Sequence, residues 1–481
     1  MFETGIRQLR MAISMVTGHR LNAANLGRLI DDVRATLAEF GEPGDTLDEQ
    51  QFLGGPLADE RSRQEFATRA LRRTVRRLAV QSPFYQRRFA AVSAEPGKLD
   101  LAGMRAVPVT TKRDLTERPR DFLCGDVSPY LTTRTTGTTG RPVEIWLSRF
   151  EMEVWPALGA LAGLLRDELR AEDVMQVNIS TRAVAATHLA AASCRLAGAG
   201  CNLLGVVTPD EALDNLTESG ATLLATWPSY LAELVTTARR RGLGPDDFRL
   251  RRVGVGGEIL SPSLAHAACQ TLGVPRIQDT FTMTEVIPVA GQTCSQHHLH
   301  HDLNTGYTEL LDLRTGEPAE PGALGTVVIT PYFPYRDCTP VFRYDTRDVA
   351  RALPDQELTC ELAGTPGMSQ VLGKASQLVQ LGPDDVVTPR QLVDAIEALP
   401  ASPWPARYRA EALPDGGRIR LTLPEAAIAG YGEAAARLHF AEAGLDVDLI
   451  IVGDAEAASL RPTRSDLREV AFTSQPAPMG A

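Results

Sequence analysis

Between residues 155 and 256 the sequence alternates between helical patterns and short runs with strand character. An Ala-rich segment with a helical pattern, Ala183–Leu196, separates the strand-like runs Val174–Ser180 and Leu203–Val207. Two later runs, Ala221–Ala225 and Arg252–Gly256, have the composition of buried strands. Such alternation predicts an α/β fold in which helices cover a sheet. Because α/β sheets bind ligands at the carboxyl ends of their strands, the residues after the last run are expected at a binding site.

Length and composition exclude several classes of protein. With 481 residues, 43% of them hydrophobic and 23% charged, the chain is expected to be a globular protein of two or more domains. It contains no apolar run long enough for a membrane span, and its first residues do not resemble a signal peptide. Seven scattered cysteines indicate reduced thiols, so we predict a cytoplasmic location. The net charge of −11 gives no reason to expect a nucleic acid partner.

The loop Thr132–Pro142, with sequence TTRTTGTTGRP, has the composition of a phosphate cradle. Its two glycines permit the positive φ angles that turn successive N–H groups toward an anion, and its hydroxyls and arginine add donors. The alternative is a polar hairpin turn, since Thr and Gly are common in turns. The predicted nucleotide-binding residues of the loop are Thr135, Thr136, Gly137, Thr138, Thr139, Gly140 and Arg141.

Three further motifs follow this loop along the chain. They are Gly256–Glu258, then Asp279–Glu285 with sequence DTFTMTE, then Arg343–Asp348 with sequence RYDTRD. In this order the four stretches resemble the phosphate-loop, adenine-flanking, Thr-Glu and ribose-binding elements of the adenylate-forming superfamily. Within that superfamily, the phenylacetate-CoA ligase branch is the most similar. The stretches that carry this closer resemblance are Ser82–Phe89, Val107–Leu115, Thr339–Asp348 and Val371–Gln377.

The resemblance implies a large N-terminal domain of several subdomains, followed by a small α+β lid domain. We place an N-terminal helical extension at residues 1–62, the large nucleotide- and substrate-binding domain at 63–373 and the lid at 374–481. The lid segment itself predicts the order βαββαβ, which is typical of a small α+β domain.

Forming an acyl-adenylate requires a metal ion, donors for the phosphates, an acceptor for the ribose hydroxyls and a surface for adenine. Glu285 offers a carboxylate for Mg²⁺, and Asp348 can accept hydrogen bonds from the ribose. Asp279 can accept a hydrogen bond from the adenine amine, and Phe281 offers a face for stacking. Two of these roles have a structural alternative, because Asp348 could pair with a neighbouring arginine and Phe281 could belong to the core.

The remaining predicted site residues come from the resemblance. It places Lys112 and Thr284 with Glu285 among the catalytic residues, and Gly257, Glu258 and Lys374 among those that bind the nucleotide. For Lys112 the alternative is a solvated surface lysine at the start of a short helix.

A second group of chemically distinctive side chains lies between the last two motifs. Four of the eight histidines fall between His297 and His301, after Cys294 and ahead of Cys338. Thiolate and imidazole are ligands that Zn²⁺ prefers, and some members of the resembling branch carry a structural zinc in this region. We therefore predict a zinc site formed by Cys294, His300 and Cys338. The alternative is solvated loop histidines with buried free thiols, since no CxxC pair is present.

The sequence departs from the resembling family at its carboxyl-terminal end. The family's adenylating lysine lies near the end of the lid, but the corresponding stretch here reads LRPTRSDLREV, and no lysine follows Lys374. The hinge element is also altered, to GKASQ at Gly373–Gln377. We therefore expect acyl transfer to CoA to be poor or absent.

The resemblance implies an ATP- and Mg²⁺-dependent, AMP-forming enzyme that activates a small aromatic carboxylic acid, in bacterial secondary metabolism or aromatic catabolism. The absent lysine leaves two alternatives within enzymes, an amide ligase and a diazotase that activates nitrite for an aryl amine. An alternative outside the enzymes is a relative that binds a nucleotide without catalysis. The presence of Glu285 and Asp348 argues against this alternative. Use of CoA stays open, the expected partners are small molecules and a second copy of the chain, and no membrane partner is expected.

Overall fold

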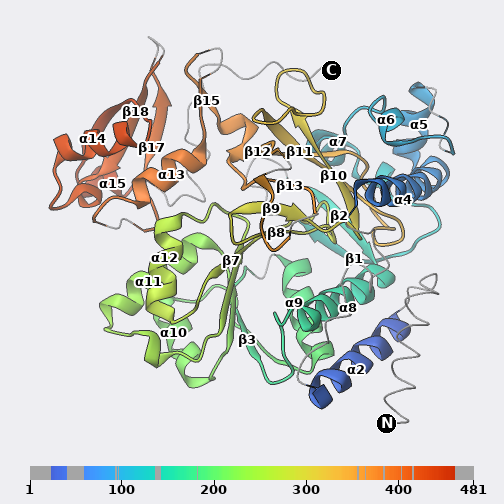
Figure 1. The fold of residues 1–481 in the computed structure, drawn as a ribbon, viewed down its shortest axis with the longest axis horizontal. Helices are drawn as coiled ribbons and strands as arrows, with labels where there is room; N and C mark the ends of the chain where they lie inside the picture. The colour runs from blue at the N-terminus through green and yellow to red at the C-terminus, as the bar shows by residue number, and fades with distance from the viewer. Residues whose placement is uncertain are drawn as a thin grey trace.

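Eight strands form one sheet that runs through the lower half and centre of the molecule (Figure 1). In this computed structural model the described residues are 23–40, 59–92, 95, 97–135, 142–180, 183–354, 357–362, 365–382, 385–401, 404–413 and 417–460. The five strands from β7 to β4 are parallel, and the other three are antiparallel. In spatial order the strands are β13 (Gly367–Ser369), β9 (His298–His301), β8 (Gly291–Thr293), β7 (Ile277–Phe281), β6 (Arg252–Gly256), β5 (Leu223–Thr226), β3 (Val174–Val177) and β4 (Gly200–Leu203).

Helices cover both faces of the parallel strands, so the predicted α/β layers are confirmed. Leu223 and Leu224 of β5 point to opposite faces and belong to two separate hydrophobic cores. One core contains α8 (Arg149–Leu165) and α9 (Val184–Ala197), and the other contains α10 (Pro209–Glu218), α11 (Pro228–Arg240) and α12 (Pro262–Leu272). The N-terminal helix α2 (Ala23–Phe40) packs against α8 from outside (Figure 1).

One predicted strand, Leu203–Val207, is displaced toward the N-terminus. The helix before it ends at Ala197, because Gly198 adopts a left-handed conformation with a φ of 86°. The strand therefore begins at Gly200 and ends at Leu203, and Val206 beyond it is 56% exposed.

A second, four-stranded antiparallel sheet has the order β10-β11-β12-β14. A separate hairpin of β1 (Pro129–Arg134) and β2 (Glu144–Ser148) contributes to the same hydrophobic core. The sheet consists of β10 (Gly306–Asp312), β11 (Leu324–Pro331), β12 (Tyr344–Arg351) and β14 (Gly373–Lys374). The helices of this half are α4 (Glu60–Gln81), α5 (Pro83–Ala91), α6 (Leu101–Met104), α7 (Lys112–Glu117) and the 3₁₀ helix η1 (Pro119–Phe122).

The C-terminal segment has a hydrophobic core of its own, and it contains the predicted βαββαβ order with two additions, the short strand β16 and the terminal helix α15. Its core residues run from Val379 to Leu449, and Ile259, which precedes α12 in the chain, belongs to the same core. β18 pairs with β17 in antiparallel and with β19 in parallel orientation. The elements are β15 (Val379–Gln380), β16 (Val386–Val387), α13 (Pro389–Glu397), β17 (Arg409–Ala412), β18 (Ile419–Pro424), α14 (Glu433–Glu442), β19 (Val447–Val452) and α15 (Asp454–Ala457).

Candidate active site

A cavity of about 480 Å³ opens where the ends of β6 and β7, the strand pair β12 and β14, and the start of α7 meet. It is the place at which α/β sheets bind ligands, outside the carboxyl ends of parallel strands. The predicted site residues that line it come from every described motif of the sequence. They are Lys112, Thr135, Gly257, Glu258, Asp279, Phe281, Thr284, Glu285, Asp348 and Lys374.

β6 ends in two glycines that the local geometry requires. A Cβ atom on Gly256 would lie 2.5 Å from the carbonyl oxygen of Thr280, and Gly257 has a φ of 83°. The backbone of β6 therefore approaches β7 closely before the chain turns into the cavity. Glu258 comes next, and its Oε2 accepts a 2.8 Å hydrogen bond from the backbone N–H of Ser229 at the start of α11. Glu258 thus both lines the cavity and satisfies a helix N-terminus.

Glu285 is a buried carboxylate with two ammonium groups in range. The residue is 4% exposed, and burial raises its pKa, while its own backbone N–H and the charges of Lys112 and Lys374 lower it. Tyr344 lies beside it, and burial together with the Glu285 charge raises the pKa of the Tyr344 phenol. The phenol is therefore neutral at physiological pH and can donate to Glu285.

Lys112 is the first residue of α7 and lines the cavity. Thr111 and Asp114 form a capping box that fixes the start of this helix, with Thr111 N–H donating to Asp114 Oδ2 at 2.8 Å. Because Lys112 reaches the cavity and contributes to the charge around Glu285, it is not an ordinary solvated surface lysine.

Asp348 pairs with a lysine rather than with a neighbouring arginine. Its Oδ1 lies 2.8 Å from Lys374 Nζ, and the two residues face each other across β12 and β14. The alternative partners are engaged elsewhere: Arg343 makes two 3.0 Å bonds to Glu309, and Arg347 lies 3.6 Å from Asp345. The carboxylate is nearly buried but lines the cavity, so it can accept hydrogen bonds from a ligand.

Asp279 and Phe281 lie on β7, at the end of the cavity near the C-terminal segment. Burial raises the pKa of Asp279 to about 6, although Arg390 and Gln370 lower it. Gln370 Nε2 donates to Asp279 Oδ2 at 3.3 Å. The Phe281 ring packs edge-to-face on His301 with centroids 5.2 Å apart, so it both lines the cavity and touches the core.

Most of the predicted phosphate loop, Thr136–Arg141, lies outside the described residues. Its two ends are described and form the antiparallel stem of β1 and β2, in which Thr135 N–H donates to the Val143 carbonyl at 3.0 Å. Arg134 and Thr135, at the described end of this stem, line the cavity.

Arg390 is a cavity-lining residue that the sequence did not reveal. It is 8% exposed, lies in the first turn of α13 and donates to the carbonyls of Val371 at 2.7 Å and Leu260 at 3.1 Å. Thr388 and Pro389 mark the helix start in the sequence. The sequence around this helix does not indicate which distant segment it packs against. The contact between Arg390 and Leu260 could therefore not be predicted.

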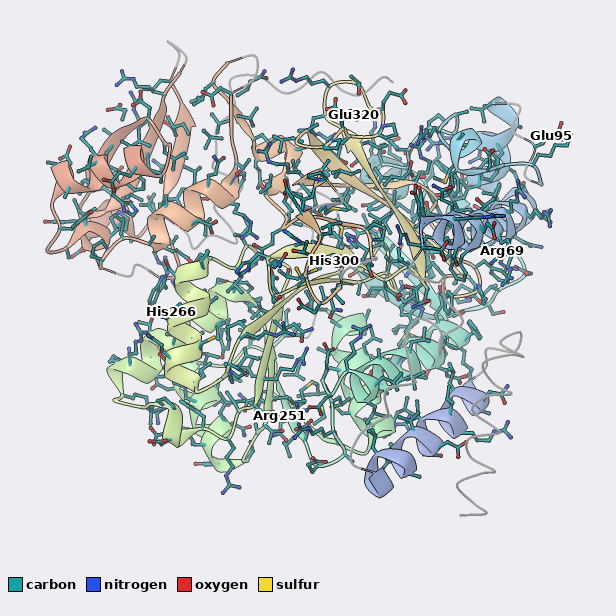
Figure 2. The ribbon with its side chains drawn as sticks, viewed as in Figure 1. Arg69, Glu95, Arg251, His266, His300 and Glu320 are labelled. Atoms are coloured by element: carbon teal, nitrogen blue, oxygen red, sulfur yellow. The ribbon has the colours of Figure 1, made fainter. Side chains whose placement is uncertain are left out.

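Four thiol and imidazole groups form a second cluster, which lies just after β8, on β9 and in the loop before β13. The ligand atoms of Cys294, His298, His300 and Cys360 all lie within 4.8 Å of one another. His300, labelled near the centre of the molecule in Figure 2, has its Nε2 3.4 Å from Cys360 Sγ, and Nδ1 3.2 Å from the Thr365 carbonyl. Two cysteines with two histidines are a ligand set for Zn²⁺.

The prediction that Cys338 belongs to this cluster is wrong. Cys338 lies in a different region, where its N–H is 3.3 Å from Glu151 Oε1 and its carbonyl accepts from Cys124 N–H. Cys360 and His298 complete the cluster instead. Cys360 is 60 residues from His300 in the chain, and it reaches the cluster because β13 pairs with β9; no spacing motif indicates this.

The comparisons with known proteins agree with this geometry. A sequence model described as "AMP-binding enzyme" matches residues 103–332. The phenylacetate-coenzyme A ligase of Pseudomonas putida is 24% identical over 283 residues, which are 56% of this chain and 62% of that protein. The ligase of the same name from Thermus thermophilus is 22% identical over 69% of this chain and 74% of that protein. By sequence the chain is therefore similar to AMP-binding enzymes and, over part of its length, to phenylacetate-coenzyme A ligases.

Solved structures show that this chain has the fold of an acyl-CoA ligase whose structure is known. 2-Hydroxyisobutyryl-CoA ligase in the postadenylation state, in complex with 2-HIB-AMP, superposes with a TM-score of 0.72 at 19% identity, over 87% of this chain and 91% of that one. The same ligase in the thioesterification state superposes with a TM-score of 0.60, again over 87% of this chain and 91% of that one. Among the described residues, no helix combines the length and apolar character needed to cross a membrane.

Proposed function

We propose that the protein is an ATP-dependent, AMP-forming enzyme that activates a small carboxylic acid as its adenylate. The observation that supports this best is the meeting of Glu285, Lys112, Asp348 and Asp279 at one cavity. These side chains supply the cation, the carboxylates and the hydrogen-bond acceptors that a bound nucleotide needs, and they come from motifs far apart in the chain.

The reaction follows from the positions of these groups. A carboxylate oxygen of the substrate forms a bond to the α-phosphorus of ATP, and the bond from that phosphorus to pyrophosphate breaks, with its electron pair leaving on pyrophosphate. Glu285 would hold Mg²⁺, which when bound neutralises the phosphate charge. A single buried carboxylate fits this role, because Mg²⁺ takes its other ligands from phosphate and water. Asp348 would hold the ribose and Asp279 the adenine amine.

The substrate we propose is an aromatic acid. The apolar part of the cavity wall includes Phe281, Met283, Leu299 and Ala183, which suit a flat hydrophobic group. The names of the curated relatives, phenylacetate-coenzyme A ligases, fit the same class of acid. The proposed partners are small molecules, and the homodimer and the cytoplasmic location stay predictions.

A second candidate is favoured by the absence of a lysine after Lys374. A chain without that cation on its lid would use ATP for a different acceptor than CoA, or for a different oxyanion. An amide ligase transfers the acyl group from AMP to an amine. A diazotase adenylates nitrite, and an aryl amine then displaces AMP from nitrogen, with loss of water giving the diazonium product.

Product analysis separates these candidates. Purified protein with ATP and Mg²⁺ is offered a panel of aryl acids with CoA, the same acids with amines, and nitrite with aryl amines. We expect pyrophosphate release to depend on one of these substrates, with a thioester as a minor product. Efficient thioester formation with a common aryl acid would contradict the second candidate. If the protein binds ATP but releases no pyrophosphate with any substrate of the panel, the proposal that it is an activating enzyme would be contradicted.

We also propose that Cys294, His298, His300 and Cys360 hold a structural zinc ion. Burial lowers the pKa of His300, which keeps the imidazole neutral as a metal ligand requires. The cluster joins the antiparallel edge of the large sheet to the loop that carries Cys360. Zinc would therefore cross-link segments that are distant in the sequence.

Zinc content of the purified protein tests this site directly. We expect about one zinc per chain, and Cys360→Ser should lose the metal and lower the melting temperature. Cys338→Ala is the matched control: it removes another buried thiol, and although packing is disturbed, the zinc content should not change. Wild-type protein without stoichiometric zinc would contradict the proposal, and loss of zinc in the control would return Cys338 to the site.

A further inference from the structure

Lysine is rare in this protein, and two of its three lysines line one cavity. Only three of the 49 cationic side chains are lysines, namely Lys98, Lys112 and Lys374. Lys98 is 79% exposed and pairs with Glu95, but the other two line the same cavity. Because arginine serves at almost every other cationic position, two compact ammonium groups at one cavity indicate a requirement for a point charge rather than a planar fork.

The backbone around Lys374 is held in place by several contacts. Gly373 has a φ of 132°, and a Cβ atom there would lie 2.4 Å from Pro389 Cγ, so only glycine fits. The Lys374 backbone N–H is bonded to Gln377 Oε1 at 3.2 Å, and the residue pairs with Asp348 across β12 and β14. The side chain therefore starts from a fixed point on the cavity wall.

The ammonium of Lys374 has capacity for a ligand. Nζ lies 2.8 Å from Asp348 Oδ1 and 3.1 Å from the Thr346 carbonyl oxygen. An ammonium group carries three N–H donors, and these two partners among the described residues leave a third for an anion. The side chain is 29% exposed, so this donor can reach the cavity.

The charge of Lys374 also acts on the carboxylate of Glu285. Lys112 and Lys374 both lower the pKa of Glu285, so the ammonium lies within electrostatic range of that group as well as beside Asp348. On the proposed function, Asp348 binds the ribose and Glu285 the metal at the leaving phosphates. The α-phosphate joins the ribose to those phosphates, and it would therefore lie between the two carboxylates, next to Lys374.

We propose that Lys374 is a catalytic residue whose ammonium binds the α-phosphate during adenylation, in place of a lysine from the end of the lid. This role rests on the proposed function. Lys374 transfers no proton: it stabilises the charge that builds on the α-phosphate oxygens while the substrate oxygen attaches and pyrophosphate leaves. Two arginines that also line the cavity form ion pairs with other carboxylates, Arg347 with Asp345 and Arg134 with Glu144. Lys374 then needs no rotation of the lid to reach its working position.

The kinetic test compares Lys374→Met, Lys374→Arg and the control Lys98→Met. The readouts are the substrate-dependent ATP–pyrophosphate exchange rate at saturating ATP, and the Kd for ATP measured separately. We expect Lys374→Met to lose about 10²-fold or more in the saturated rate, Lys374→Arg to recover part of it, and Lys98→Met to match the wild type. If Lys374 only supported Asp348, the Kd would rise while the saturated rate stayed within about threefold of the wild type, and this would overturn the proposal.

A labelling experiment decides the position of Lys374 without requiring turnover. An acyl-AMP with a reactive mixed anhydride at the α-phosphate acylates the nearest amine, and peptide mapping must distinguish only three lysines and the chain terminus. We expect Lys374 to be acylated, with protection by excess AMP and no protected labelling of Lys98. Protected acylation of Lys112 without Lys374 would overturn the proposal. Absence of exchange in the wild type with every panel substrate would instead contradict the proposed function. The labelling would still show whether the Lys374 ammonium lies next to the α-phosphate of the bound acyl-AMP.

Discussion

Glu285→Gln is expected to reduce ATP–pyrophosphate exchange by about 10²- to 10³-fold while leaving the fold intact. The amide keeps the shape of the side chain but removes the negative charge that would bind Mg²⁺ and that faces Lys112 and Lys374. Burial already raises the pKa of this carboxyl, so the fold gains nothing from the charge itself. The variant should therefore melt at or above the wild-type temperature, as expected where a group serves function at the expense of stability.

The matched control for this substitution is Glu117→Gln on α7. Glu117 is 54% exposed and forms a surface pair with Arg113, which is 83% exposed. Such pairs contribute about 0–1 kcal/mol, so both exchange and melting temperature should match the wild type. A Glu285→Gln enzyme with a near wild-type exchange rate and an unchanged Mg²⁺ requirement would show that another group holds the metal.

Segments whose structure is set by local pattern could be predicted from the sequence. The strand Arg252–Gly256 was predicted at its observed bounds, because an apolar run ended by two glycines has few alternatives. The displaced strand at Gly200–Leu203 shows the limit of that reasoning. Its start depends on the left-handed turn at Gly198, and hydropathy does not report which residue of a Gly-containing loop begins the strand.

Contacts between distant segments could be predicted only in part. The order of motifs led us to expect Asp279, Glu285 and Asp348 around one ligand, and they line one cavity. The ion pair between Asp348 and Lys374 depends on the pairing of β12 with a two-residue strand, which no local pattern indicates. For the same reason the predicted zinc site included Cys338 and did not include Cys360, since no sequence pattern indicates the pairing between β13 and β9.

Asp348→Ala should weaken nucleotide binding through loss of the ribose contact. Hydrogen bonds to a carboxylate contribute about 1.5–3 kcal/mol each, so two of them correspond to a Kd higher by about 10²- to 10⁴-fold. The lower end of this range is the expected result. Lys374 already holds Oδ1 at 2.8 Å, so part of the carboxylate's hydrogen-bonding capacity is used before the ribose arrives.

A nucleotide without ribose hydroxyls separates this contact from the effect on Lys374. Wild-type protein should bind 2′,3′-dideoxy-ATP about 10²-fold more weakly than ATP, whereas Asp348→Ala should bind the two nucleotides about equally. Lys374→Met supplies the comparison, since it removes the ion-pair partner but keeps the carboxylate, and it should still discriminate between them. If Asp348→Ala retained the wild-type preference for ATP, the ribose would bind elsewhere and Asp348 would serve only to hold Lys374. The ratio of the two affinities thus shows whether Asp348 binds the ribose or only holds Lys374. A substitution that merely loosens the cavity weakens the binding of both nucleotides to the same extent.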